Sequence, residues 1–245
     1  MKRATLTIVG VGPGDPELIT VKGLRAIQAA NVVFVPRSRK NEESFALRIA
    51  QQWLDHSRQK VVSVTLAMSR DKNESHTAWQ KVADQIAENL AEIEDHQQEV
   101  HGVYLLLGDS MLYSTFAYLQ AELLLRHSQI KMQFIPGITS FAATAAQAQI
   151  SLAQADEKII IVPASEQIDS KQLRSLLTDF ETVILMKVGP VLPQIIKLLE
   201  ELALQERVIF AEKVGMPEEY ITQDLAALRE KQHSYLSLLI VQQKK

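Results

Sequence analysis

One segment of this chain concentrates side chains that can bind a polar ligand. Residues 108–116, Gly-Asp-Ser-Met-Leu-Tyr-Ser-Thr-Phe, follow the apolar run 103–107 and combine a carboxylate with several hydroxyls. Such a set suits a cationic or ribose-bearing ligand. Because ligands of open α/β sheets bind beyond the carboxyl ends of strands, we predict that Asp109 orients a ligand there. The alternative, that Asp109 only caps the next helix, stays open.

A glycine-rich loop follows another apolar run, residues 6–9. Residues 10–16 read Gly-Val-Gly-Pro-Gly-Asp-Pro, and such glycines let the backbone approach a ligand closely. The spacing does not fit the dinucleotide fingerprint, because Asp15 stands where its third glycine belongs and would repel a phosphate. Arg37 at the end of the next strand suits a 2′-phosphate, so an NADP site remains a minor alternative. A tight turn that binds nothing is the other.

Three further strand ends carry small or polar residues. In residues 135–141, Thr139 or Ser140 is suited to cap the following helix or to hydrogen-bond an adenine. Met186 ends one apolar run of the second half, and residues 210–215 end another. Met186 taken alone is more typical of a core than of a ligand site.

The residue inventory excludes several kinds of chemistry. The absence of cysteine rules out disulfides, thiolate metal sites and a cysteine nucleophile. The histidines, which we interpret as surface or helix residues, show no paired metal-ligand spacing, so we predict no metal held by the protein. They are His56, His76, His96, His101, His127 and His233.

The formal net charge of −3 gives no broad basic footprint, so we expect no nucleic-acid partner. The apolar run 6–9 is too short for a signal-peptide core, and no later stretch reaches membrane-spanning length. We therefore expect no membrane association and a cytoplasmic location.

The first half of the chain alternates between strand and helix patterns. A helical pattern that opens at Pro16 separates the first two strands, which should therefore run parallel. The expected strands are residues 6–9, 32–35, 61–66, 103–107 and 132–135. The expected helices include residues 43–53, 76–94 and 114–125.

The second half continues the alternation after Pro136-Gly137, where we place a domain boundary. Its expected strands are residues 158–162, 182–186, 208–211 and 235–241, and its expected helices are residues 171–177 and 192–204. The predicted fold class is α/β, with two α/β domains in series, residues 1–135 and 136–245. We expect a mainly parallel first sheet, a mixed second sheet and an active-site cleft between the domains.

Taken in this order, the segments resemble those of the tetrapyrrole (corrin/porphyrin) methylases, the class III S-adenosylmethionine methyltransferases. Residues 9–23, VGVGPGDPELITVKG, look like the first signature of that family, and residues 136–140, PGITS, look like its interdomain signature. The resemblance covers nearly the whole chain. Residues 108–116, GDSMLYSTF, are similar to the branch that methylates C20 of precorrin-2 or of its cobalt complex, cobalt-factor II.

The resemblance implies S-adenosylmethionine as cofactor, a small-molecule tetrapyrrole as substrate, a role in cobalamin biosynthesis and a homodimer. The implied cofactor contacts are Pro13, Leu107, Gly108, Asp109, Met111, Tyr113, Ser114, Thr139, Ser140, Met186, Glu212, Lys213 and Val214. The implied substrate contacts are Gly14, Asp15, Arg37, Ser38, Arg39 and Thr115. The arginines among them suit the carboxylates of a tetrapyrrole, although a solvated basic loop is an equal alternative.

One residue departs from the pattern of related enzymes. Uroporphyrinogen methylases carry an Asp before the Arg that ends the second strand, whereas this chain has Pro36 before Arg37. Methyl transfer requires alignment and exclusion of water, so we assign no general base. Methylation at another position, such as C2 or C7 of uroporphyrinogen III, diphthine synthesis, and a non-catalytic nucleotide-binding regulator remain alternatives.

Overall fold

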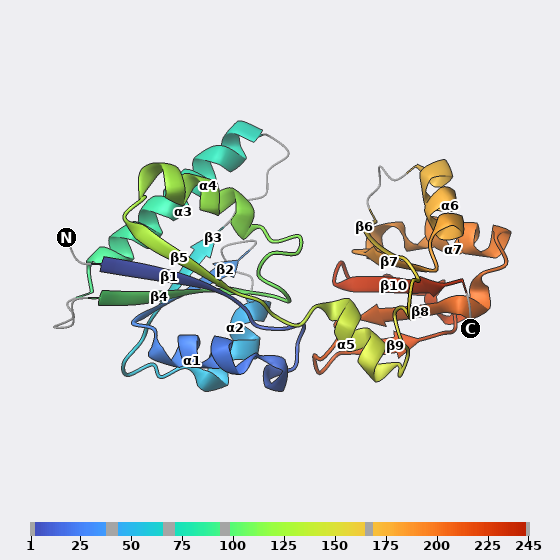
Figure 1. Cartoon of the computed structure of the whole chain (residues 1–245), viewed down its shortest axis with the longest axis horizontal. Coiled ribbons are helices and arrows are strands. Elements are labelled where there is room, and N and C mark those ends of the chain that lie inside the picture. Colours follow the sequence, from blue (N-terminus) through green and yellow to red (C-terminus); the bar gives the residue numbers. More distant parts are fainter. Residues whose placement is uncertain (1–2, 38–43, 66–71, 94–98, 165–168, 244–245) are drawn as a thin grey trace. The chain divides into compact units, whose positions relative to one another are not determined.

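The computed structural model describes residues 3–37, 44–65, 72–93, 99–164 and 169–243. The chain forms two compact units, residues 1–139 and 140–245, each with its own β-sheet (Figure 1). Pro136 and Gly137, on which the predicted domain boundary rests, lie at the end of the first unit. The boundary after residue 135 stays a proposal.

The sheet of the first unit has five parallel strands in the order β3-β2-β4-β1-β5. Its strands are β1 (Arg3–Gly10), β2 (Val32–Arg37), β3 (Lys60–Thr65), β4 (Glu99–Leu106) and β5 (Ile130–Ile135). The helices of this unit are α1 (Val21–Ala29), α2 (Phe45–Ala50), α3 (Lys72–Ala91) and α4 (Phe116–Arg126). The prediction of a parallel first sheet is confirmed.

Apolar residues cover both faces of this sheet, as expected for parallel strands. On one face, Val9 and Val33 pack with Ile27 of α1, and α2 joins the same cluster. On the other face, Leu6 packs with α3 and with Phe116 of α4. Figure 1 shows α1 and α2 below the sheet and α3 and α4 above it.

The second unit contains a mixed five-stranded sheet in the order β6-β7-β10-β8-β9. β6 pairs parallel with β7, whereas β10 runs antiparallel to both β7 and β8. Its strands are β6 (Ile159–Pro163), β7 (Thr182–Met186), β8 (Val208–Glu212), β9 (Tyr220–Thr222) and β10 (Ser237–Gln242). Its helices are α5 (Ser140–Gln147), α6 (Ser170–Asp179) and α7 (Leu192–Glu201). The α/β fold class and the mixed second sheet are confirmed.

Two local details differ from the expectation. The helical pattern predicted from Pro16 is broken: a 3₁₀ turn covers Pro16–Leu18, and α1 begins only at Val21. Two side chains cause the break, because Asp15 caps the 3₁₀ turn through the Glu17 N–H and Thr20 caps α1 through the Gly23 N–H. The short strand β9 was not predicted, because three residues are too few to show a period.

Candidate functional site

The candidate site of the first unit lies where β1 and β4 end side by side. β1 and β4 pair along their whole length, from Arg3 opposite Glu99 to Gly10 opposite Leu106. The chain after β1 leads to α1 on one face, and the chain after β4 leads to α4 on the other (Figure 1). Loops that leave neighbouring strands toward opposite faces open a crevice, which is where open α/β sheets bind ligands.

Three glycines bring the loops after β1, β4 and β5 into direct backbone contact. A Cβ atom on Gly10 would lie 2.6 Å from the Gly108 carbonyl oxygen and 2.7 Å from the Gly137 nitrogen. Gly12 and Gly108 each donate to the other's carbonyl oxygen, at 3.2 and 2.8 Å. Both adopt positive φ, 81° and 71° respectively. The glycines of these three loops therefore build one junction.

Both carboxylate oxygens of Asp109 accept hydrogen bonds at this junction. Its Oδ1 accepts from the backbone N–H groups of Met111 and Leu112 at 2.8 and 3.0 Å, and its Oδ2 accepts from Gly137 at 2.9 Å. Asp109 therefore joins the loops after β4 and β5, and the alternative that it caps α4, which begins at Phe116, is wrong.

The same bonds keep Asp109 charged. Partial burial by itself would raise the pKa of Asp109, but donation from Met111, Gly137, Leu112 and Ser110 lowers it further than burial raises it. The pKa consequently lies below the ordinary value of 3.8. The junction thus holds a permanent negative charge at neutral pH.

The remainder of the loop after β4 combines exposed apolar groups with one buried hydroxyl. Met111 is 58% and Tyr113 is 42% exposed, and Tyr113 has a φ of 51°, which is uncommon for a non-glycine residue. Ser110 is 1% exposed, and its Oγ has no hydrogen-bond partner within the part of the chain that the structure describes. A buried hydroxyl without a partner is costly unless a water or a ligand satisfies it.

The other predicted residues of this loop flank the start of α4. Leu107 and Gly108 are half-buried, and Thr115 is the N-cap residue of α4 without a side-chain bond. The Phe116 N–H donates instead to Ser114 Oγ at 3.1 Å. These residues are close to the junction in the sequence. Their contacts with a ligand stay predictions.

Several residues of the loop after β1 are buried or bond within the loop itself. Pro13 and Gly14 are buried, whereas the Asp15 carboxylate accepts from the Glu17 N–H at 2.8 Å. Arg37 ends β2 at the same edge of the sheet, and its buried Nε has no partner among the described residues. Two predicted substrate contacts, Ser38 and Arg39, lie outside the described residues.

In the second unit, Met186 and Glu212 end two strands on either side of β10. Met186 lies opposite Leu238, and Glu212 lies opposite Ser237. The residues that follow them, Lys187 and Lys213, have φ angles of 63° and 49°, so both turns are conformationally strained. The structure therefore brings these two predicted cofactor segments to one edge of the second sheet, and Val214 is buried beside them.

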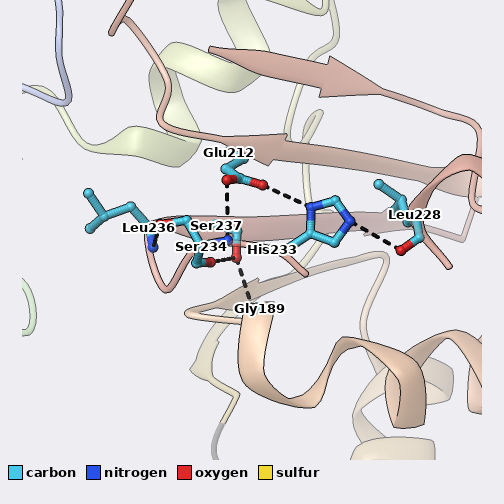
Figure 2. A network of polar contacts seen from close by, with 7 residues as sticks. All are labelled: Gly189, Glu212, Leu228, His233, Ser234, Leu236 and Ser237. Carbon is cyan, nitrogen blue, oxygen red and sulfur yellow. Dashed lines mark hydrogen bonds and ion pairs between the residues drawn. The ribbon is translucent and has the colours of Figure 1, made fainter. Parts of the chain in front are cut away.

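A polar network connects residues of these turns (Figure 2). His233 Nδ1 is 2.8 Å from Glu212 Oε2, and Glu212 Oε1 accepts from the Ser234 N–H at 3.2 Å. Ser237 Oγ accepts from the Gly189 N–H at 2.9 Å and donates to the Ser234 carbonyl oxygen at 2.6 Å. The network connects the turns after β7 and β8 through the chain before β10.

His233 was not predicted as a site residue, and the interpretation of every histidine as a surface or helix residue is wrong here. Its side chain is 4% exposed and lies outside any helix. No spacing in the sequence marks it, because its partner Glu212 is 21 residues away.

Thr139 and Ser140 stand at the start of α5, only two and three residues beyond Gly137. The Ser140 carbonyl oxygen accepts from Thr144 Oγ1 at 2.8 Å. The cofactor contacts expected of Thr139 and Ser140 stay predictions.

A separate cavity of about 660 Å³ lies in the second unit beside α7. Among the residues discussed above, Gly189 and His233 line it, whereas none of the predicted cofactor or substrate contacts does. We therefore place the candidate site at the strand ends and not in this cavity. The described residues contain no group of three or more His, Asp or Glu side chains that could hold a metal ion. Among them, too, no helix is long and apolar enough to cross a membrane.

Comparison with known proteins decides the family. The model of the tetrapyrrole (corrin/porphyrin) methylases matches residues 5–228. The chain belongs to this family. Tetrapyrrole methylases use S-adenosylmethionine, so the expectation of an S-adenosylmethionine-dependent methyltransferase is confirmed.

Two relatives indicate a branch of the tetrapyrrole methylases. A protein of Methanocaldococcus jannaschii named a probable cobalt-precorrin-2 C(20)-methyltransferase is 30% identical over 179 residues, 73% of this chain and 70% of the relative. The cobalt-precorrin-2 C(20)-methyltransferase of Salmonella typhimurium is 29% identical over 214 residues, 87% of this chain and 85% of the relative.

Solved structures of tetrapyrrole methylases share the fold. A cobalt precorrin-4 methyltransferase aligns with 97% of this chain and 94% of its own, with a TM-score of 0.68 and 22% identity. A uroporphyrin-III C-methyltransferase from Thermus thermophilus, complexed with S-adenosyl homocysteine, aligns with 98% of this chain and 97% of its own, with a TM-score of 0.63 and 21% identity.

Proposed function

We propose that this tetrapyrrole methylase transfers one methyl group to C20 of precorrin-2, or of its cobalt complex, in cobalamin biosynthesis. The observation that carries the proposal is the loop GDSMLYSTF, residues 108–116, placed at the junction of β1, β4 and β5. The names of two relatives at about 30% identity support the same position on the ring. Methylation at C2 or C7 is the alternative within the family.

The residues at the junction fit S-adenosylmethionine. Asp109 remains ionised and so favours a cationic ligand nearby, while Met111 and Tyr113 expose apolar surface beside it. Ser110 offers a buried hydroxyl without a partner among the described residues. A Cβ atom on Gly108 would meet nothing within 4 Å, so the glycine leaves open space above the loop.

We assign binding to the junction and orientation to Asp109. When bound, S-adenosylmethionine supplies an electrophilic methyl group on a sulfonium, and the displacement requires the acceptor carbon in line with it. Asp109 acts through the backbone that it holds, because both of its oxygens already accept N–H groups. The chain has no residue to which we assign a proton transfer.

We propose that residues near the carboxyl end of β2 recognise the substrate. The buried Arg37 Nε suits hydrogen bonding to a carboxylate, and Pro36 stands where uroporphyrinogen methylases carry an Asp. Gly14, Asp15 and Thr115 are the further proposed substrate contacts.

The decisive experiment is product analysis. Purified protein is supplied with S-adenosylmethionine and either precorrin-2 or its cobalt complex, and NMR locates the new methyl group. We expect one methyl group at C20, and the faster of the two rings identifies the physiological form. A product methylated at C2 or C7 would refute the branch. Binding of NADP without binding of S-adenosylhomocysteine, measured by calorimetry, would refute the methylase function.

A matched pair of aspartates tests the role of the junction. We expect Asp109→Ala to weaken S-adenosylhomocysteine binding by about 10- to 100-fold, because three or more backbone donors lose their acceptor. Asp156→Ala, at an exposed turn of the second unit, is the control and should leave the Kd unchanged. Equal dissociation constants for both variants would remove Asp109 from the site.

A homodimer and a cytoplasmic location complete the proposal, both on the basis of the family resemblance. Analytical ultracentrifugation of the purified chain tests the first, and cell fractionation tests the second. A monomer at micromolar concentration, or recovery in the membrane fraction, would contradict the respective proposal.

A further inference from the structure

His233 stands out as a buried, titratable group that the proposed reaction does not use. Its side chain is 4% exposed, and its ring makes a T-shaped contact with the Phe210 ring at a centroid distance of 4.7 Å. Both ring nitrogens have polar partners, Nδ1 with Glu212 Oε2 at 2.8 Å and Nε2 with the Leu228 carbonyl oxygen at 3.1 Å (Figure 2). The imidazole is therefore fixed from two sides.

The hydrogen-bonding chemistry of Glu212 and of the Leu228 carbonyl oxygen determines how many protons the His233 ring carries. A backbone carbonyl and a carboxylate are acceptors only, and a neutral imidazole has a single N–H. With one N–H, one ring nitrogen would point its lone pair at an oxygen lone pair inside the protein. Two N–H groups satisfy both oxygens and place a positive ring against the Glu212 carboxylate.

We propose that His233 is a positioning residue, held as an imidazolium between Glu212 and the Leu228 carbonyl oxygen, that fixes the turn after β8 for the cofactor. The proposal rests on the proposed function and on the prediction that residues 212–214 contact S-adenosylmethionine. It changes the role expected of Glu212, because both carboxylate oxygens of that residue bond within the protein. Glu212 then contributes to binding through the backbone that it holds.

The turn after β8 requires such support because it contains a residue with a strained backbone conformation. Lys213 has a φ of 49°, and its N–H donates to the Leu236 carbonyl oxygen at 2.9 Å. Strained residues persist only where neighbouring contacts hold them. The ion pair ties Glu212, directly before the strained residue, to the chain that precedes β10.

The same chain reaches the turn after β7. Ser237 Oγ bonds Gly189 N and the Ser234 carbonyl oxygen, and the Ser237 carbonyl oxygen accepts from the Lys187 N–H at 2.8 Å. The segment that contains His233 therefore bonds to the turns after β7 and β8, and both turns adjoin predicted cofactor residues. The charged residues that line the same cavity as His233 are Lys197, Glu200, Arg229 and Lys231.

The proton count is tested by NMR. A long-range ¹H–¹⁵N spectrum of the full chain at neutral pH distinguishes an imidazolium from either neutral tautomer. We expect His233 to show two protonated nitrogens in the wild type and one in Glu212→Gln, which keeps the shape of the partner but removes its charge. Glu206→Gln, at an exposed position, is the control and should preserve the wild-type signal. One bare nitrogen on His233 in the wild type would overturn the proposal.

The positioning role is tested by calorimetric titration with S-adenosylhomocysteine. We expect His233→Ala to raise the Kd by about tenfold and Glu212→Gln to raise it by a smaller factor, because a charge-assisted bond that holds the turn is lost. His56→Ala, at an exposed turn of the first unit, is the matched control and should bind as the wild type does. Should His233→Ala fail to fold, Glu212→Gln provides the same comparison.

The two hypotheses fail in different ways. A wild type that does not bind S-adenosylhomocysteine would refute the proposed function, while the NMR spectrum would still decide the state of His233. A wild type that binds, together with Glu212→Gln and His233→Ala variants that bind equally well, would refute the positioning role alone.

Discussion

The two sheets support their strand-end loops by different means. In the first unit, Gly10, Gly108 and Gly137 place three strand ends in backbone contact, and Asp109 ties the loops after β4 and β5 together. In the second unit, side chains span the space between strand ends, with His233 against Glu212 and Ser237 against Gly189.

The strand-end loops of the two sheets therefore depend on different physical properties. A junction of glycines depends on close approach, so a side chain added where the backbones touch, at Gly10 or Gly137, separates the strands. A side-chain network depends on the match between donors and acceptors, so a substitution that preserves shape can still disrupt it. Substitutions at the two edges should therefore differ in size and in their dependence on charge.

The largest effect is expected at the glycine junction. Gly10→Ala places a Cβ atom 2.6 Å from the Gly108 carbonyl oxygen, between backbones that cannot separate cheaply. We expect a loss of about 1–3 kcal/mol or more in the free energy of unfolding, measured with urea. Gly108→Ala is the matched control, because it meets no atom within 4 Å and suffers only from its φ of 71°. Equal losses for both variants would show that close approach is not what the junction requires.

An intermediate effect is expected at Asp109. In Asp109→Asn, the amide NH₂ faces backbone donors that the carboxylate accepted, so the variant should lose about 1–3 kcal/mol of stability at neutral pH. The folded pKa of Asp109 lies below its ordinary value of 3.8, so the advantage of the wild type is present above that value and disappears as the pH falls through the folded pKa. Urea unfolding at neutral and acidic pH measures this difference. A gap between the two proteins that does not narrow in acid would contradict the role of the charge.

The smallest effect is expected at Ser237. Ser237→Ala removes one acceptor from Gly189 and one donor from Ser234, and we expect a loss of about 1 kcal/mol or slightly more. Ser128→Ala, at an exposed turn, should be neutral in the same urea unfolding experiment. If Ser237→Ala destabilises as strongly as Gly10→Ala, the distinction between the two edges fails.

Much of the fold could be predicted because its signals are local. Residues 32–35 are all buried in β2, as their continuous apolar run indicates, and β7 covers residues 182–186 as predicted. The break between the 3₁₀ turn at Pro16 and α1 was missed, since two consecutive caps interrupt a single helical pattern. β9 was missed because it has too few residues to alternate visibly.

The candidate site could be predicted only in part, for the same reason. Asp109 follows a buried strand, and that position together with the family resemblance indicated an orienting role. Its bond to Gly137 spans 28 residues, and the bond between Glu212 and His233 spans 21, so no spacing rule connects either pair. The first contact depends on the strand order that places β1 between β4 and β5, and the second depends on the pairing of β8 with β10.

The family, the α/β fold class and the loops that contain the predicted ligand-binding residues could all be inferred from the amino-acid sequence. Those properties follow from residue types at fixed local spacing, which a chain carries before it folds. The hydrogen-bond partners of the side chains in those loops became visible in the folded chain alone. The tertiary structure turned Asp109 into a bridge between two loops and revealed His233 as the partner of Glu212. The physical reason is that a hydrogen bond between distant residues exists only once the sheet has brought their strand ends together.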